Sequence, residues 1–490
     1  MTDPTPSPTR RISGLTATSI VVANIIGTGI FTSLGFQVGD LPSGFAIMML
    51  WFVGGICAMC GALCYAELGA ALPRSGGEYH YLGTIFHPAL GFMAGWISAT
   101  AGFAAPVALA AMAFGKYLTG VWPGVSPLAA SLAVVWLVTP FLLGDTKLGS
   151  RFQNGSTLLK VALILVVIAV GCFAGSSQPV SFLPNAGDGG RIASAPFAAS
   201  LVYVMFAYSG WNASTYIAGE VRNPSRTIPL SVGLGTLLVM GLYLAVNAVF
   251  LLSTPMAEMA GKVEVALTAG PYLFGTTGTK IMAGLICVGL VSTISAMMWI
   301  GPRVTVVMGE DLLGEENRRI GRVPSINEDV RRFFGPWPWI FGILPWVIVI
   351  LLSLFSLDRC TSKSRSGTPV RATMVQFVLV NLFLLTTSFD QVINATMFIL
   401  QLCSFLTVLG VFVLRHKRPD LARPYRTWGY PVTPLVFLAV SAWMLWSILL
   451  SKPVESLIGL GTAAIGLILY LLSAKNPPSS LPSPPYHEPQ

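Results

Sequence analysis

The stretch Val21-Val-Ala-Asn-Ile-Ile-Gly27-Thr28-Gly29-Ile30-Phe31 decides the fold of this chain. It lies inside an apolar segment that is long enough to cross a bilayer as a helix. Each of its two glycines costs about 1 kcal/mol relative to alanine in a helix, so we predict that the helix is interrupted here. Close packing of two helices would also explain an isolated pair of glycines.

A second segment of the same kind is Phe206-Ala-Tyr-Ser209-Gly-Trp211-Asn212, in the sixth apolar span. The first and sixth spans run in opposite directions, and paired interruptions in such spans indicate an inverted-repeat transporter. Unwinding frees backbone N–H groups that attract a carboxylate and C=O groups that accept from an ammonium. A zwitterionic α-amino acid carries both charges, so the two interruptions predict an amino acid site.

Composition places the whole chain in the membrane. Of its 490 residues 54% are hydrophobic and 10% are charged, whereas a soluble domain carries about 25% charged residues. Strand-like alternation is absent, so we predict an all-α integral membrane protein with about 12 transmembrane helices. The predicted spans are 13–36, 43–71, 88–118, 127–143, 155–175, 197–218, 228–253, 279–308, 372–388, 391–415, 431–451 and 454–474.

Lysines and arginines predict the orientation. If the N-terminus is cytoplasmic, the outside segments hold few of the 29 basic residues, while the others lie inside. The outside residues are Lys116, Arg191, Lys262, Lys280 and Lys452. We therefore expect both termini in the cytoplasm and the protein in the plasma membrane. The net charge of +9 is explained by this bias, and no nucleic-acid-binding module is visible.

The spans group into five predicted segments. Residues 1–12 form a disordered tail, 13–175 a first five-helix repeat, 197–415 a second repeat, 431–474 two further helices and 476–490 a disordered tail. The second repeat contains an atypical insertion at about 312–367. Within it, Trp337–Leu357 is apolar enough to span, but basic residues flank it on both sides. We predict a re-entrant or interfacial segment on the cytoplasmic side.

Enzyme chemistry and metal binding find no support in the sequence. The pair Cys57-Ala-Met-Cys60 lies at membrane depth and fits the packing of small residues better than a metal site. The four histidines are scattered, and the spans carry no catalytic motif. We therefore expect no metal, no cofactor and no catalytic residues.

Four stretches carry a family resemblance. They are Gly27-Thr28-Gly29-Ile30-Phe31, Ala66-Glu67-Leu68 through Glu78-Tyr79, Glu220-Val-Arg-Asn-Pro-Ser-Arg-Thr-Ile-Pro229, and Arg423-Pro-Tyr-Arg426 followed by Gly429-Tyr-Pro431. In this order they resemble the amino acid–polyamine–organocation superfamily, and within it the L-type-like branch of amino acid permeases. The resemblance implies a five-plus-five inverted repeat with broken helices 1 and 6, two additional C-terminal helices and alternating access.

The resemblance also implies a substrate site. The first break would hold the substrate carboxylate, Phe206 would cover the substrate, and the rest of the sixth-helix break would line its side-chain pocket. The implied residues are Ile26, Gly27, Thr28, Gly29, Phe206, Ser209, Trp211 and Asn212. Ser209 stands where relatives with a broad pocket often have glycine, which argues against bulky substrates. Ordinary core packing remains the alternative for Phe206 and Trp211.

Lys160, near the start of the fifth span, has two interpretations. It is either a lysine that extends its ammonium to the membrane surface, or a coupling residue whose ammonium replaces sodium, as in sodium-independent relatives. By contrast, Glu67, Arg74, Glu220 and Arg226 are expected at cytoplasmic helix ends, in folding or gating roles.

The predicted function is therefore secondary transport of small neutral amino acids, independent of sodium and either proton-coupled or by exchange. The preference for neutral substrates rests on the expectation that the motif carboxylates all lie at helix ends, away from the substrate. The expected partners are an amino acid, the lipid bilayer and, if transport is proton-coupled, a proton. No obligate protein partner is indicated. An amino acid sensor with the same fold is the alternative.

Overall fold

A computed structural model describes residues 12–143, 146–174, 178–312, 369–387 and 389–473 of the chain. Within these ranges the regular structure is helical, and the one β-type contact is an isolated bridge between Ile12 and Val221. The predicted insertion Trp337–Leu357 and both predicted tails lie outside the described residues.

The described residues contain all twelve predicted spans. Nine are long apolar helical segments, and three are shorter apolar helices, Pro127–Leu142, Ala195–Ala207 and Val370–Thr386. The unbroken spans are α3 (Gly44–Ala71), α7 (Pro127–Leu142), α8 (Thr146–Ala174), α11 (Pro224–Ser253), α14 (Gly278–Leu312), α18 (Val370–Thr386), α19 (Phe389–Lys417), α20 (Val432–Ser451) and α21 (Pro453–Ser473). The all-α membrane architecture is confirmed.

Both predicted breaks are present. The first span consists of α1 (Gly14–Ile25) and α2 (Gly29–Gln37), and the sixth of α10 (Ala195–Ala207) followed by a 3-10 helix, η2 (Ala213–Glu220). Ser13 and Ser194 cap the starts of α1 and α10 by accepting from backbone N–H groups three residues on. The chain at the second break turns through Gly210, whose φ of 98° favours glycine.

The third span has a feature that the sequence did not predict. It begins as α5 (Pro88–Ile97), widens into a π-helical segment, η1 (Ser98–Ala104), and continues as α6 (Ala105–Val121). Such widened turns are rare and often occur at functional sites. Here the π-helical segment turns Gly102 and Phe103 toward the cavity described below.

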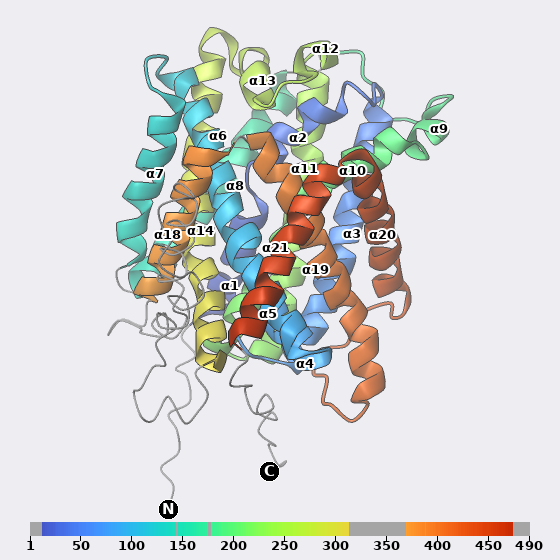
Figure 1. Cartoon of the computed structure of the whole chain (residues 1–490). Helices are drawn as coiled ribbons and strands as arrows, with labels where there is room; N and C mark the ends of the chain where they lie inside the picture. The colour runs from blue at the N-terminus through green and yellow to red at the C-terminus, as the bar shows by residue number, and fades with distance from the viewer. Residues whose placement is uncertain (1–11, 144–145, 175–177, 313–368, 388, 474–490) are drawn as a thin grey trace, which may run out of the picture.

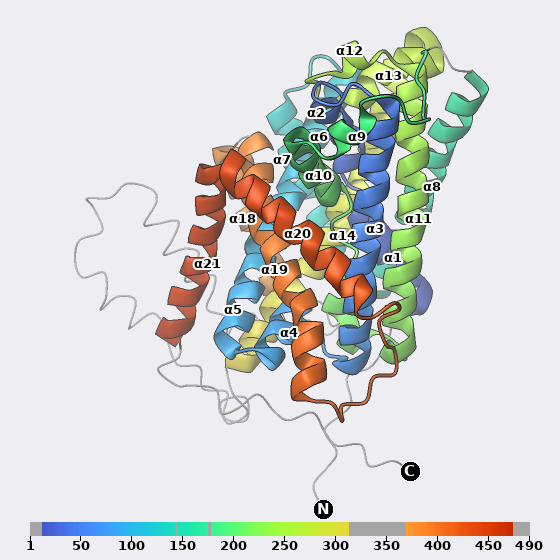
Figure 2. The same cartoon turned by 90° about the vertical axis from the view of Figure 1, so that its right-hand side faces the viewer.

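Packing between the spans follows the inverted repeat. The second span of each repeat contacts that of the other, α3 on α11, and the third spans pair in the same way, α6 on α14. The broken spans cross over, with α1 against α11 and α10 against α3. The last two helices lie on the outside of the bundle, where α20 packs on α3 and α10, and α21 on α5 and α19 (Figures 1 and 2).

Short helices cover the two ends of the bundle. One end carries α4 (Glu78–Ile85), and we call it the α4 end (Figure 1, bottom). The opposite end carries α9 (Asp188–Ile192), α12 (Met256–Met259), α13 (Val265–Phe274) and the 3-10 turn η3 (Gly275–Thr277). These connecting helices are too short to span and were not predicted.

Candidate functional site

The two breaks touch each other reciprocally. A Cβ atom on Gly29 would lie 2.5 Å from Cα of Ala207, the last residue of α10. A Cβ atom on Gly210 would lie 2.9 Å from the backbone carbonyl of Asn24 in α1. Real carbon atoms keep about 3.5–4.0 Å apart, so only glycine fits at either position. Close packing therefore explains Gly29 and Gly210, and it accompanies the helix breaks.

Tyr243 of α11 joins the two breaks. Its hydroxyl lies 2.7 Å from the carbonyl oxygen of Ile25 and 3.0 Å from that of Ala207. Both carbonyls lie at the end of an interrupted helix, where a carbonyl group has no hydrogen-bond partner within its own helix. Trp51 packs edge-on against the Tyr243 ring at 5.6 Å and holds it in place.

Lys160 anchors the first break from the other side. Its ammonium donates to the carbonyl oxygens of Ile26 at 2.7 Å and Ala23 at 3.2 Å, and to Oγ1 of Thr293 at 2.7 Å. The residue is 2% exposed, so its ammonium does not reach the membrane surface. The first of the two interpretations is thus excluded by geometry, and the lysine lies at the break.

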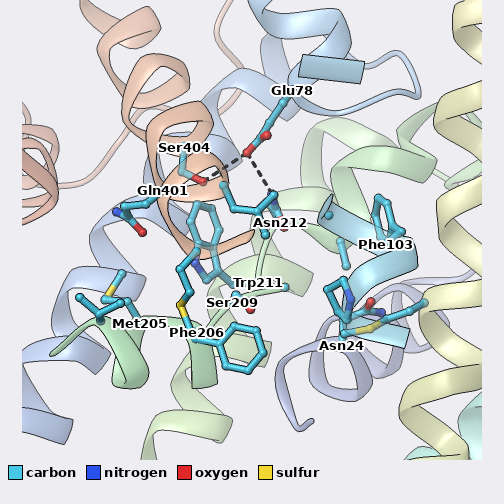
Figure 3. A pocket seen from close by; sticks show the side chains of 18 of the residues that line it. Asn24, Glu78, Phe103, Met205, Phe206, Ser209, Trp211, Asn212, Gln401 and Ser404 are labelled. Atoms are coloured by element: carbon cyan, nitrogen blue, oxygen red, sulfur yellow. Dashed lines mark hydrogen bonds between the residues drawn. The ribbon is translucent and has the colours of Figure 1, made fainter. Parts of the chain in front are cut away.

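A cavity of about 90 Å³ lies beside the second break. Since one water needs about 10–15 Å³, this volume accommodates a ligand of several heavy atoms. Val202 of α10 and Ile448 of α20 line the cavity. Glu78 and Ser404 line it as well and lie close together in Figure 3. Its remaining lining comes from α1, η1, α6, α10, the second break, η2, α14, α19 and α20.

The predicted residues of the sixth span lie together at this cavity. Phe206, Ser209, Trp211 and Asn212 all line it, and all are labelled in Figure 3. Phe206 and Ser209 are partly exposed to it, whereas Trp211 is 4% exposed and packs edge-on against Tyr65 at 4.6 Å. Core packing is therefore part of the role of Trp211, as the alternative interpretation stated.

The predicted residues of the first span do not line the cavity. Ile26, Thr28 and Gly29 are buried at the crossing, and Gly27 is partly exposed. Asn24, one turn earlier, is the residue of this span that lines the cavity (Figure 3). Several break carbonyls are also paired with Tyr243, Lys160 and Thr293, which leaves a substrate ammonium fewer backbone acceptors than the sequence predicted.

Further polar residues that the sequence did not predict for the site also line the cavity. Gln401 and Ser404 line it from α19, three residues apart and so on one helix face. Polar residues at this spacing inside an apolar span are a signal that could have identified them.

Glu78 corrects a prediction. It stands at the start of α4, as a helix-end carboxylate should, but its side chain is 3% exposed and lines the cavity. Burial raises the pKa of Glu78 to about 7, although hydrogen bonds from Tyr65, Ser404 and Asn212 oppose the shift. The expectation that no carboxylate remains near the substrate was therefore wrong.

The other motif carboxylates lie near helix ends, as predicted, and form ion pairs that the sequence did not predict. Both oxygens of Glu67 accept from Arg415, at 2.8 and 2.6 Å, which ties α3 to α19. Glu220 receives two bonds from Arg303 of α14, at 2.8 and 3.1 Å. Arg74 pairs with Asp311 of α14. These pairs connect the helices around the α4 end.

Comparison with known proteins identifies relatives over almost the whole chain. Residues 12–468 match the amino acid permease family. The large neutral amino acids transporter small subunit 2 of Mus musculus is 29% identical over 477 residues, which are 94% of this chain and 81% of that protein. The Asc-type amino acid transporter 1 of Mus musculus is 26% identical over 480 residues, with 94% and 81% covered.

A bacterial protein is similar over a larger share of its own length. The serine/threonine exchanger SteT of Bacillus subtilis is 24% identical over 465 residues, covering 94% of this chain and 96% of the exchanger. The mouse relative named a small subunit is, by that name, part of an assembly with another subunit. Its likeness weighs against the expectation that this chain needs no protein partner.

Three observations agree on the class of protein: the match to one family, the names of the relatives, and the twelve spans with two crossing breaks. They support a transporter rather than an enzyme, and they give no support to a sensor. This chain belongs to the amino acid permease family and is an integral membrane transporter of amino acids.

Proposed function

We propose that this transporter carries small neutral amino acids by alternating access, without sodium. The observation that carries the proposal is the cavity of about 90 Å³ beside the second helix break. Its polar lining includes the hydroxyls of Ser209 and Ser404 and the amides of Asn212 and Gln401, which carry no charge. The carboxyl group of Glu78 also lines it, and burial raises the pKa of this group to about 7, so that it is largely uncharged below that pH. Uncharged hydrogen-bonding groups of this kind suit side chains such as those of alanine, serine and threonine.

The backbone of the first break is proposed to hold the substrate carboxylate. The first N–H groups of α2 have no partner within that helix and carry the positive end of its dipole. Gly27 is the partly exposed residue there, and Ile26, Thr28 and Gly29 complete the turn. The cavity beside Asn24 would extend to this turn when the crossing loosens during transport.

The second break is proposed to bind the rest of the substrate. Phe206, partly exposed and projecting into the cavity, would cover the bound amino acid. Ser209 and Asn212 would contact its side chain, and Trp211 would form the floor. Met205 and Met397 narrow the same cavity, which favours small substrates. The name of the bacterial serine/threonine exchanger agrees with this substrate class.

Sodium independence is proposed from Lys160. Its ammonium is bound by two break carbonyls and a threonine hydroxyl, which are hard oxygen ligands of the kind a sodium ion would use. The fixed positive charge therefore supplies what a bound cation would supply at the break. Proton coupling and amino acid exchange are the two remaining ways to drive the cycle.

The topology and setting are also proposals. We assign the α4 end to the cytoplasm and both termini to the same side, because the inside loops hold most of the basic residues. We further propose that the protein resides in the plasma membrane.

Counterflow tests the proposal. The purified chain is reconstituted into liposomes loaded with unlabelled amino acid, and the entry of labelled alanine, serine, threonine and leucine is measured against that of arginine and lysine. We expect entry of the small neutral amino acids in sodium-free buffer. Stronger competition by arginine or lysine would contradict the substrate class, and no counterflow with any amino acid would contradict transport by the chain alone.

A further inference from the structure

Glu78 is the carboxylate of the cavity wall, and the proposed mechanism gives it no role. Gly76 and Gly77, with φ of 115° and 53°, turn the chain so that Glu78 enters the bundle at the start of α4. In Figure 3 its side chain points toward Ser404 and Asn212, away from its own backbone and into the cavity.

The hydrogen bonds of Glu78 come from three separate elements. Oε1 accepts from the Tyr65 hydroxyl of α3, from Oγ of Ser404 of α19 at 3.3 Å and from Nδ2 of Asn212 at the second break at 3.4 Å. These are elements that must move relative to one another if the cavity opens toward the α4 end. The carboxyl group of Glu78 would therefore change from buried to hydrated during the transport cycle.

Glu78 differs from the other motif carboxylates because it lacks a basic partner. Glu67 and Glu220 each pair with an arginine, but among the described residues no lysine, arginine or histidine forms an ion pair with Glu78. A buried carboxylate without a countercharge favours its protonated form. Such a group can take up a proton reversibly near neutral pH.

The titratable neighbours of Glu78 do not compete for this proton. Tyr65 of α3, Tyr216 of η2 and Cys403 of α19 face it, and phenols and thiols are uncharged near neutral pH. On its own helix, burial lowers the pKa of His80 to about 3, so that ring is neutral as well. The charged Lys417 of α19 binds the carbonyl of Ile85, at the far end of α4.

We propose that Glu78 is a proton-binding site, and that one proton bound there crosses the membrane with each amino acid. The proposal rests on the proposed transport function and selects proton symport over exchange. With the α4 end closed, the buried carboxylate binds a proton that arrives through the cavity and becomes a neutral carboxyl group. When the α4 end opens, Tyr65, Ser404 and Asn212 separate, and the hydrated carboxyl group releases the proton to cytoplasmic water.

The pKa of the hydrated carboxyl group should return toward the ordinary glutamate value of about 4.3. The proton is therefore released when the α4 end opens. In the closed form, with a pKa of about 7, Glu78 is about nine-tenths protonated at pH 6 and about one-tenth at pH 8. Uptake that depends on the protonated form should therefore fall as the outside pH rises through 7.

The experiment measures uptake into voltage-clamped liposomes with an inside pH of 7.5 and an outside pH between 6 and 8. We expect the wild-type chain to take up amino acid several-fold faster at an outside pH of 6 than of 8, and to acidify the lumen. Glu78→Gln, which keeps the neutral shape, should retain counterflow but lose the pH response and the proton flux. Glu258→Gln, a carboxylate on α12 at the opposite end, should behave like the wild-type chain.

Ser404→Ala provides a second measurement that a structural role would not reproduce. It removes one donor to the ionised carboxylate, which raises the pKa of Glu78 and should shift the midpoint of the pH profile upward by about one unit. This variant also keeps the test decisive if Glu78→Gln fails to fold.

Two outcomes separate this inference from the proposed function. Counterflow by the wild-type chain without any pH response or proton flux would overturn the proton site and leave amino acid transport intact. No counterflow by the wild-type chain would overturn the proposed function itself. A pH response that persists unchanged in Glu78→Gln would show that another group binds the proton.

Discussion

The crossing of the two breaks makes a sharp prediction about Gly29. Replacing it with alanine adds one Cβ atom, which would lie 2.5 Å from Cα and 2.7 Å from Cβ of Ala207. Ordinary contacts need about 3.5–4.0 Å, so the two breaks would have to separate by about 1 Å. Because both obstructing atoms belong to the backbone or lie next to it, no side-chain rotation can relieve the clash.

Overpacking of this kind costs about 1–3 kcal/mol, and 1.4 kcal/mol corresponds to a tenfold change in an equilibrium constant. We therefore expect Gly29→Ala to lower both the thermal stability and the uptake, the latter by about tenfold or more. Gly29→Val should abolish uptake while membrane insertion persists, because the apolar spans that drive insertion are unchanged.

Gly27→Ala is the matched control. The same single atom at Gly27 would lie 3.7 Å from Cγ2 of Thr293, which is an ordinary contact. This variant should keep the stability of the wild-type chain, and any loss of uptake should appear in KM. Gly210→Ala should be at least as damaging as Gly29→Ala, because it combines a 2.9 Å contact with a φ of 98°.

The assay compares melting temperature in detergent with initial rates of uptake in liposomes, normalised to reconstituted protein. Wild-type uptake and stability in Gly29→Ala would refute the argument that the breaks must touch. An equal fall in melting temperature in Gly27→Ala and Gly29→Ala would also refute it, since the two positions differ in the space available to the added atom.

Three further predictions concern the anchors of the breaks and the topology. Tyr243→Phe leaves two break carbonyls without their donor, which should lower the stability by about 1–3 kcal/mol and slow uptake. Tyr208→Phe loses a single 3.3 Å hydrogen bond and should lower the melting temperature less. A larger loss of stability in Tyr208→Phe than in Tyr243→Phe would contradict the proposed role of Tyr243 in joining the breaks. Wild-type uptake should be unchanged when choline replaces sodium, and Lys160→Met should lose it; a collapse of wild-type uptake in choline would eliminate the sodium-independent mechanism. In a chain without native cysteines, Asp420→Cys should react with an impermeant reagent only from the cytoplasm and Lys262→Cys only from outside, whereas the opposite pattern would invert the topology.

The fold could be predicted from the sequence because its signals are local. Apolar length predicts each span, and paired glycines predict the two breaks. All twelve spans are present in the described residues, at nearly the predicted positions. The π-helical segment Ser98–Ala104 was missed because it lies within one continuous apolar span, and the helix Val265–Phe274 because its ten residues are too few to span a bilayer.

The cavity could be predicted only in part, because its lining depends on which helix faces meet. Asn212 and Ser209 were found because they belong to a break. Gln401 and Ser404 belong to an unbroken span, and the sequence does not say which partner its polar face meets. Glu78 was assigned to a helix end, which is correct for its backbone, but only the packed structure places its side chain in the cavity.

The geometry of the first break explains why its residues and the cavity lie apart. Lys160 and Thr293 hold the carbonyls of this break from the side of α8 and α14, whereas the cavity opens on the side of α19 and α20. A small cavity of about 20 Å³ borders Lys160, and it shares no lining residue with the larger one. The internal cation therefore lies at the first break, whereas the space proposed for the substrate lies at the second. Because Gly29 touches Ala207 directly, movement of either break must displace the other, and this contact can transmit binding in the cavity to the lysine without any shared residue.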